Sequence, residues 1–448
     1  MKNPRLITWS ITSALAGFLF GFDTVVISGA EQRIRELWEL SSSMHGLCLS
    51  MALWGTVLGS LMGSIPCERF GRKKTLISIG LLYFVSAIGS AIAQDPYSFM
   101  VARFIGGVGI GVATIAAPLY ISEISPANMR GRLAGMFQFN IVFGILIAFV
   151  SNYFIGRIFP EDVAWRWMLG IEALPAIVYG FMCFCISESP RWLIIHEDRQ
   201  EEAAAICRSI YPDMTDTEIQ DLVNSIAAST ETSSPSAKKP FFTSRLKLPI
   251  ILAFLIAFFN QLSGINAILY FAPRIFQWTG LEESAALLQS VGIGITNLIF
   301  TFVGLYLIDT FGRRTLLYIG SFGYIISLGL CSYAFSIEYY AIVPFCIFAF
   351  IAAHAVGQGA VIWVFISEIF PNAHRAVGQA LGSFTHWFFA ASLTLVFPIM
   401  ADSLAPAIIF GFFCFMMILQ LIWVKAMVPE TKQVPLEEIE IKLGVREA

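Results

Sequence analysis

The hexapeptide Ile121-Ser-Glu-Ile-Ser-Pro126 recurs with one residue changed as Ile366-Ser-Glu-Ile-Phe-Pro371. Each copy is followed by an arginine four residues after its proline, and the copies stand 245 residues apart (366 − 121). A second motif, Glu68-Arg-Phe-Gly-Arg-Lys73, recurs as Asp309-Thr-Phe-Gly-Arg-Arg314 at an offset of 241 residues (309 − 68). Two separate motifs at nearly one offset indicate that the chain consists of two related halves.

The composition places both halves in a membrane. Of the 448 residues, 57% are apolar and 13% are charged, against about 25% charged residues in an average globular protein. Since a membrane helix needs roughly 20 apolar residues, the chain could form about a dozen spans. A soluble multidomain enzyme could not cover so much apolar surface with so few charges. The net charge of −3 gives no reason to expect a nucleic-acid partner.

The apolar residues fall into twelve segments, six on each side of a polar interval. The runs are long and continuous, whereas a transmembrane β-barrel would show alternating stretches of about ten residues. We therefore predict an all-α membrane protein with 12 transmembrane helices in two six-helix bundles. The segments are 7–30, 45–66, 75–94, 97–122, 133–155, 166–187, 248–273, 285–308, 315–336, 340–367, 377–401 and 405–427.

The polar interval predicts a short cytoplasmic connector. Its charged run at 197–202 and its Ser/Thr-rich stretch at 229–236 favour one or two short helices around 197–228, followed by a flexible stretch. The predicted domains are an N-terminal bundle (1–190), the connector (191–247), a C-terminal bundle (248–430) and a cytoplasmic tail (431–448).

The basic residues predict the orientation in the membrane. With the N-terminus inside, 22 of the 28 lysines and arginines fall in inner loops and tails, and five fall in outer loops. Such a bias is the positive-inside signal. We expect a multi-pass protein of the cytoplasmic membrane with both termini in the cytoplasm.

No residue pattern indicates catalysis. The eight cysteines form no C-x-x-C pair and lie mostly within apolar segments, so we expect neither disulfides nor a metal site. The sequence contains no phosphate-binding glycine loop, H-E-x-x-H motif or Ser/His/Asp set. We expect no enzyme activity and no cofactor.

The repeated acid–base motifs favour a mechanical role. Glu123 and Glu368 are predicted at cytoplasmic ends of spans, within reach of the arginine clusters at 69–73 and 313–314. Ion pairs there could hold the two halves together in one state and separate in another, which is the bistable contact that alternating access requires. The alternative is that these charges only fix the topology at helix ends.

Two charged residues within spans are functional candidates. Asp23 follows a Gly-rich run in the first segment, and Arg103 lies early in the fourth. A charge in the middle of a membrane helix costs roughly 2.5–3.5 kcal/mol on insertion scales, so an ionisable group there indicates function. A structural salt bridge is the alternative, although buried ion pairs stabilise poorly.

The sequence resembles the sugar porter family of the major facilitator superfamily over nearly its whole length. Nine motifs occur in the family's order, and together they are far more specific than any one of them. The resemblance implies two parallel six-helix halves around a central polar cavity. The motifs are 17–23 with 28–30, 68–73, 103–107, 123–131, 188–191, 261–266, 309–314, 363–368 and 429–432.

The resemblance assigns roles to the charged residues. In proton-coupled members an Asp at the position of Asp23 carries the proton and an Arg at the position of Arg103 tunes it, whereas facilitative members have a neutral residue instead of the Asp. The motif matches also imply a set of gating ion-pair residues at the cytoplasmic ends of the spans. These are Glu68, Arg69, Arg72, Glu123, Arg130, Glu188, Arg191, Asp309, Arg313, Arg314, Glu368, Arg375 and Glu430.

The resemblance also implies a set of sugar-contacting side chains. A sugar binds through neutral donors and acceptors and an aromatic plate, because charged groups would hold water too tightly. The alternative for amides within spans is hydrogen bonding between helices. The expected substrate-binding residues are Gln138, Asn260, Gln261, Asn266, Asn297, Trp363, His386, Phe20 and Tyr270.

Four positions depart from the family's pattern. Asn260 stands where many members have Gln, and His386 stands where Asn or Gln is usual. Ala360 replaces the proline of a Gly-Pro hinge in the tenth segment. Ile145 occupies a place where some pentose-binding members carry Gln, which favours a hexose.

We therefore predict a secondary active transporter that works by alternating access. It is expected to carry a hexose or a related sugar or polyol by proton symport, as a monomer whose partners are the sugar, H⁺ and the lipid bilayer. Two alternatives stay open: a facilitative sugar uniporter of the same fold, and a non-transporting sugar sensor.

Overall fold

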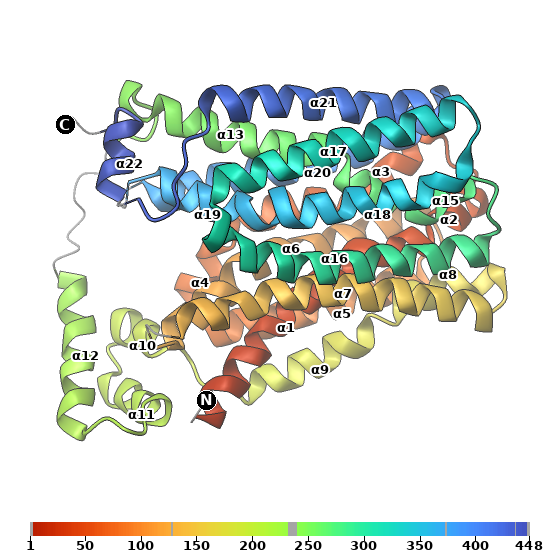
Figure 1. Ribbon diagram of the computed structural model, residues 1–448. Coiled ribbons are helices and arrows are strands. Elements are labelled where there is room, and N and C mark those ends of the chain that lie inside the picture. Colours follow the sequence, from red (N-terminus) through yellow and green to blue (C-terminus); the bar gives the residue numbers. More distant parts are fainter. Residues whose placement is uncertain (1–2, 127–128, 232–239, 372–373, 435, 446–448) are drawn as a thin grey trace.

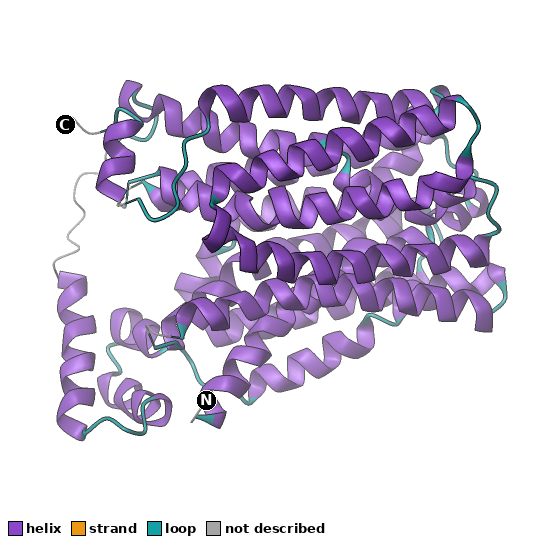
Figure 2. Ribbon diagram, in the orientation of Figure 1, coloured by secondary structure: helices purple, strands orange, loops and turns teal. Residues whose placement is uncertain are grey.

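The computed structural model describes residues 3–126, 129–231, 240–371, 374–434 and 436–445. Within these ranges the chain is helical and has no strand, and twelve helices or helix groups are long and apolar enough to cross a membrane (Figures 1 and 2). The predicted fold class is therefore confirmed.

Six spans form the N-terminal half, and two of them are divided into shorter helices. The short helix α2 (Glu31–Leu37) joins the first span to the second. The spans are α1 (Pro4–Val26), α3 (Ser42–Met62) with α4 (Ser64–Phe70), α5 (Arg72–Ile92), α6 (Pro96–Ile124), α7 (Arg130–Ile158), and α8 (Glu161–Gly170) with α9 (Ala173–Phe184).

Six further spans form the C-terminal half. Its first and fourth spans are interrupted, the fourth by a π-helical segment, Ala355–Gly359. The spans are α13 (Lys247–Leu262) with α14 (Ile265–Tyr270) and α15 (Ala272–Gln277), α16 (Glu283–Phe311), α17 (Arg313–Ser336), α18 (Val343–His354) with α19 (Ala360–Ile369), α20 (Arg375–Ser403), and α21 (Pro406–Met427).

Three short helices lie between the halves in the sequence: α10 (Pro190–Glu197), α11 (Gln200–Ile210) and α12 (Asp216–Glu231). The last two occupy the region where one or two helices were expected, whereas α10 was not predicted. It begins at Pro190 because the Ser189 hydroxyl accepts a hydrogen bond from the Trp192 N–H and proline suits the first helical position. A further helix, α22 (Leu436–Lys442), follows the last span.

The two ends of the bundle differ. Helices α10–α12 and α22 lie at one end together with both termini, and we call this the connector end (Figure 1). Helices α2 and α15 lie at the opposite end, which we call the α2 end (Figure 1). The connector helices pack on the N-terminal half, since Trp192, Ile206 and Ile219 belong to a buried apolar cluster with residues of α1, α5 and α6.

The break in the seventh span depends on one glycine. Gly264 has φ +89°, a left-handed conformation that residues with a side chain rarely adopt. The ring of Phe413 on α21 packs against it, 2.7 Å from where a Cβ would stand. The chain therefore ends α13 after Leu262 and starts α14 at Ile265, and the two amides Gln261 and Asn266 lie on different helices.

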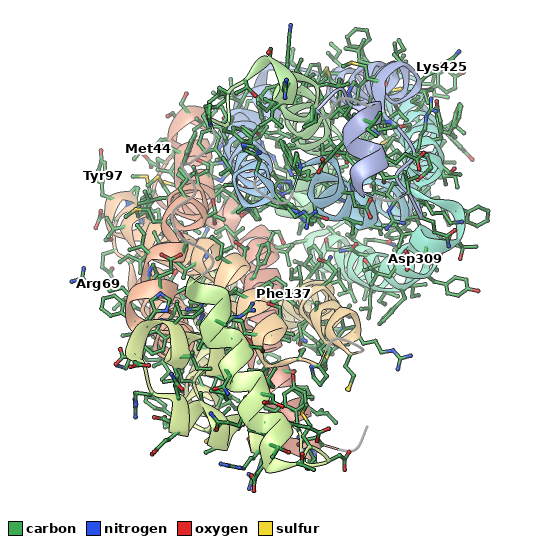
Figure 3. The ribbon with its side chains drawn as sticks, turned by 90° about the vertical axis from the view of Figure 1, so that its left-hand side faces the viewer. Met44, Arg69, Tyr97, Phe137, Asp309 and Lys425 are labelled. Carbon is green, nitrogen blue, oxygen red and sulfur yellow. The ribbon has the colours of Figure 1, made fainter. Side chains whose placement is uncertain are left out.

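The halves meet along two long helix pairs, α3 with α20 and α7 with α16, and α1 also packs on α14. The approach of α3 to α20 is close, because a Cβ at Gly46 would collide with the carbonyl oxygen of Leu395. Seen from the connector end, the molecule divides into two lobes (Figure 3). Groups of the two halves can therefore meet in the middle of the molecule, where charged and amide side chains gather.

Candidate functional site

A buried ion pair joins the first and fourth spans. Arg103 on α6 donates from Nη1 to Asp23 Oδ1 on α1 over 2.6 Å, and from Nη2 to Asp23 Oδ2 over 3.2 Å. The exposed fraction is 0% for the Asp23 side chain and 2% for the Arg103 side chain. The two charges that the sequence places within spans are therefore in direct contact.

A second carboxyl group, which sequence reasoning missed, belongs to this cluster. Glu172, between α8 and α9, is buried, and its carboxyl group interacts electrostatically with Asp23 and Arg103. The signal was present, because Glu172 stands inside the predicted segment 166–187. Two ionised carboxylates beside one guanidinium would bury a net negative charge, so the dry cluster is neutral only when one carboxyl group holds a proton.

Small side chains make room for this cluster. A Cβ at Gly106 on α6 would collide with the Ser86 side chain of α5 and would stand 4.0 Å from Asp23 Oδ1. The Ser86 hydroxyl and Arg103 Nε are buried without a hydrogen-bond partner among the described residues. Because the cluster is fully buried, an unbalanced charge there is costly.

An amide cluster lies in the C-terminal half, around the break in the seventh span. Gln261 Oε1 accepts a hydrogen bond of 2.6 Å from Asn266 Nδ2, and Gln261 Nε2 donates to Asn260 Oδ1 over 2.9 Å. Gln261 Nε2 also lies 3.1 Å from Nε2 of His386 on α20, to which it can donate. Three expected amides and the expected histidine are therefore in one hydrogen-bonded group.

Aromatic rings border this amide cluster. The rings of Trp363 on α19 and His386 have centroids 5.2 Å apart. Phe20 on α1 packs edge-on against Trp387, with centroids 5.5 Å apart. Because Trp387 follows His386 on α20, Phe20 of the N-terminal half reaches the same region as Trp363 of the C-terminal half.

Tyr270 connects the amide cluster with the charged cluster. It lies on α14, one turn after Asn266, so both side chains lie on the same face of this helix. Its hydroxyl is buried without a hydrogen-bond partner in the described chain and interacts electrostatically with Arg103 and Asp23. The two remaining expected amides, Gln138 on α7 and Asn297 on α16, are half-buried and form no hydrogen bond with the amide cluster among the described residues.

The repeated motifs form two similar ion pairs at the connector end. Arg72 on α5 donates to both carboxylate oxygens of Glu123 on α6, over 2.9 and 2.8 Å. Arg313 on α17 donates in the same way to Glu368 on α19, over 3.1 and 2.8 Å. Each pair closes within its own half, so the contact between halves that the sequence suggested is not formed by these residues. The reason is that the arginine and the acid of each pair lie on neighbouring helices of one half. Arg72 begins α5 and Arg313 begins α17.

In each half, a second acid that follows the last span accepts hydrogen bonds from the backbone at this arginine. Glu188 accepts hydrogen bonds from the backbone N–H groups of Arg72 and Lys73, and Glu430 accepts from those of Arg313 and Arg314. These N–H groups are the free donors at the starts of α5 and α17. Burial of the Glu188 carboxyl raises its pKa, against the lowering effect of these hydrogen bonds.

The other expected gating residues are more exposed. Glu68, Arg69 and Arg191 are exposed, Arg375 is half-buried, and the side chain of Arg130 lies outside the described residues. Asp309 is exposed and stands 3.4 Å from Arg313 within the same motif. Figure 3 shows Arg69 and Asp309, one from each motif copy, on separate lobes.

Polar contacts between the halves occur at the α2 end, around a residue that sequence reasoning missed. Asp402 on α20 accepts hydrogen bonds from Arg35 on α2 over 3.0 Å and from Arg274 on α15 over 2.8 Å, and Ser42 of α3 also donates to it. The hydrogen bond to Asp402 raises the pKa of Arg35. The contacts with Arg35 and Ser42 join the two halves at the α2 end, whereas the contact with Arg274 lies within the C-terminal half.

Comparison with known proteins gives consistent matches over the whole chain. A family model described as "Sugar (and other) transporter" matches residues 9–443. The arabinose-proton symporter of Bacillus subtilis is 33% identical over 98% of this chain and 95% of its own length. The D-xylose-proton symporter of Escherichia coli is 32% identical over 98% of this chain and 96% of its own length.

Solved structures of the xylose transporter XylE from E. coli also match. Its inward open conformation gives a TM-score of 0.87 at 31% identity, over 98% of this chain and 99% of that one. The same protein bound to 6-bromo-6-deoxy-D-glucose gives a TM-score of 0.79 over the same shares of both chains. The present conformation is thus closer to the inward open structure than to the sugar-bound one.

Proposed function

Because this chain belongs to the sugar (and other) transporter family, we propose that it is a secondary active transporter that carries a monosaccharide across the membrane together with a proton. Relatives that it matches over nearly their whole length are named arabinose-proton and D-xylose-proton symporters. Its family and relatives are transporters and not enzymes.

The buried contact between Asp23 and Arg103 is the observation that carries this proposal. With one of its two carboxyl groups protonated, the cluster has no net charge, and it can stay dry while the halves close around it. Loss of the proton leaves a net negative charge, which needs water and so favours a conformation in which water reaches Asp23. Proton binding thereby selects between conformations.

The amide cluster and its aromatic border are the proposed sugar site. Gln261, Asn266 and His386 offer neutral donors and acceptors, and Trp363 offers an aromatic face beside them. We include Asn260, Gln138, Asn297 and Phe20 in the same site, as groups that complete it when a sugar is bound. Charged side chains are absent from this set, which allows the sugar to leave as well as to bind.

Helix α14 is the proposed link between sugar and proton. It carries Asn266 at the amide cluster and Tyr270 near Asp23, and it packs on α1, which carries Asp23. A sugar that binds Asn266 fixes α14, and α14 in turn fixes Tyr270 against the charged cluster. Sugar binding and protonation of Asp23 therefore favour the same arrangement of α1 and α14.

We propose that the connector end faces the cytoplasm and the α2 end faces outward, in a multi-pass protein of the cytoplasmic membrane that works as a monomer. The basic residues support this orientation through the positive-inside rule. The polar contacts of Asp402 at the α2 end and the similarity to the inward open structure support an inward-facing state for this conformation. The ion pairs at the connector end hold the helices of each half together, so that each half moves as one body.

The proposal is tested in proteoliposomes with Asp23→Asn. The wild type should accumulate its sugar against a gradient when the outside is acidic, and sugar addition should make the outside more alkaline. The variant should lose uphill accumulation and the alkalinisation, and it should keep the exchange of sugar between the two sides. The reason is that a neutral amide needs no proton to stay buried. Uphill transport by Asp23→Asn would contradict coupling through Asp23. Uptake by the wild type that ignores a pH gradient would leave the facilitative uniporter as the function.

A further inference from the structure

A second buried titratable pair lies at the α2 end. His45 Nε2 on α3 stands 3.1 Å from Glu31 Oε2 on α2 and 3.0 Å from the carbonyl oxygen of Glu31. The exposed fraction is 0% for the His45 side chain and 1% for the Glu31 side chain. Since both atoms that face Nε2 are acceptors, Nε2 carries the hydrogen. The hydrogen bond from Nε2 goes to the Glu31 carbonyl oxygen, and His45 Nδ1 and both carboxyl oxygens of Glu31 have no hydrogen-bond partner in the described chain.

The C-terminal half covers this pair. The ring of Phe271, between α14 and α15, packs edge-on against the His45 ring with centroids 6.4 Å apart. Gly46, next to His45, lies against the backbone of Leu395 on α20. Glu31 and His45 belong to the N-terminal half and their cover belongs to the other, so the pair is dry only while the halves are closed at the α2 end.

The charged groups around the Glu31–His45 pair form ion pairs with one another. Arg35, one turn after Glu31 on α2, interacts with it electrostatically but is hydrogen-bonded to Asp402 of α20. Arg274 of α15 is bonded to the same carboxylate. Both arginines and Asp402 are partly exposed, so water screens their charges, whereas the pair is fully buried.

The number of protons on the pair decides whether it can be buried. In water, a histidine loses its charge above about pH 6.5, and a glutamate is ionised above about pH 4.3. A water-exposed pair above about pH 6.5 is therefore a neutral imidazole beside a carboxylate, with a net negative charge. A dry site favours the neutral pair, which holds one more proton.

We propose that Glu31 and His45 form a second proton-binding site, which takes up one proton when the α2 end closes and releases it to the same side when that end opens. The orientation of this site rests on the proposed function. Because the proton enters and leaves on one side, it is not transported and does not change the number of protons carried per sugar. Alkaline medium outside would hold the α2 end open and slow the transport cycle, separately from the effect of pH on Asp23.

The experiment measures opening of the α2 end directly, without sugar or transport. Spin labels at Leu37→Cys and Leu404→Cys, two exposed sites on opposite halves at this end, report the open and closed fractions. The parent protein for labelling carries Cys185→Ser and Cys414→Ser, and also Asp23→Asn, so that Asp23 cannot contribute a pH dependence. In this parent, the ratio of open to closed should rise with pH above about 6.5, by up to about tenfold per pH unit.

Two variants separate the pair from other sources of pH dependence. Glu31→Gln removes the carboxyl group whose negative charge the buried pair must neutralise, so the ratio should be flat from about pH 7 to 9. With His45→Gln, only Glu31 can titrate, so the dependence should remain and its onset should move down by about two pH units. The matched control is Glu36→Gln, an exposed acid on the same helix, which should behave as the parent does.

A parent whose ratio is independent of pH, or a Glu31→Gln variant that keeps the parent's slope, would overturn the proposal. A Glu31→Gln protein that does not fold leaves His45→Gln to decide, because an unchanged onset in that variant is also contrary to the proposal. Failure in this experiment would not bear on sugar transport, which the accumulation assay tests independently.

Discussion

Asp23, Arg103 and Glu172 form a cluster in which one proton decides the net charge. The sequence identifies Asp23 and Arg103 because a charge inside a span is costly, and the same reasoning applies to Glu172. What the sequence does not contain is that all three side chains meet, since they come from the first, fourth and sixth spans. The protonation of each group in the cluster therefore depends on the charges of the other two.

Replacing Glu172 with Gln should weaken proton binding by the cluster. It removes one negative charge beside Asp23, and a nearby like charge is what favours the protonated carboxyl group. The external pH above which sugar uptake falls should therefore move lower, by roughly one pH unit or more. Uptake rates between about pH 5 and 8 measure this shift. Glu161→Gln, on the same span but outside the cluster, should leave the pH profile in place, and an unshifted Glu172→Gln profile would count against the shared proton.

Replacing His386 with Ala should weaken sugar binding and leave coupling intact. The change removes the ring beside Trp363 and the acceptor for Gln261 Nε2, and the loss of about 1 kcal/mol corresponds to a KM about fivefold higher. Uptake kinetics with the number of protons per sugar measure both quantities. His354→Ala is the matched control, because His354 bonds Tyr324 within the C-terminal half and should affect thermal stability and not KM. An unchanged KM in His386→Ala would exclude it from the sugar site.

In both halves, one helix begins after a glycine with positive φ, and an acid accepts hydrogen bonds from its first backbone N–H groups. Gly71 before α5 and Gly312 before α17 have φ of +89° and +88°, and a Cβ at either position would collide with or crowd the carboxylate of Glu188 or Glu430. The glycine lets the acid reach the free N–H groups of the helix, and the arginine that follows then faces its partner acid. The motif therefore builds each half internally, which is why its two copies do not meet.

Gly71→Ala should destabilise the N-terminal half. A non-glycine residue in this conformation costs about 1–3 kcal/mol, and the displaced Glu188 carboxylate would lose its hydrogen bonds. The melting temperature in detergent should fall by several degrees. Gly135→Ala on α7 is the matched control, because no described atom beyond its own stretch of helix lies within 4 Å of its Cβ position and alanine favours the helix by about 1 kcal/mol. Equal melting temperatures for the two variants would contradict this account of the motif.

The whole molecule is held closed at the α2 end by contacts between halves. Asp402 joins α20 to α2 through Arg35, and α3 and α20 touch backbone to backbone at Gly46. At the connector end, the ion pairs of the repeated motifs stay within one half. Polar contacts across the halves at the α2 end, and ion pairs within each half at the connector end, are what a carrier closed at the α2 end requires.

Asp402→Asn should shift the molecule toward opening at the α2 end. Exposed ion pairs contribute about 0–1 kcal/mol each, so loss of the pair with Arg35, which crosses the halves, should raise the ratio of open to closed by up to about fivefold. The spin-label distance between Leu37→Cys and Leu404→Cys measures this ratio. The effect should shrink in high salt, and Asp162→Asn at the same end should have none. A closed fraction equal to that of the wild type would remove Asp402 from the closure.

The sequence by itself determined the number of spans, the two related halves and the candidates for charge and sugar contact. These features depend on local properties: the length of an apolar run, a repeated motif, and the cost of a charge in lipid. Only the tertiary structure decided which charges pair. It joined Glu172 to Asp23, kept Arg72 and Arg313 within their own halves, and placed Asp402 and the Glu31–His45 pair at the closure between halves. Such pairings depend on how helices that are far apart in the sequence pack together. A pattern along one segment does not predict which other segments contact it.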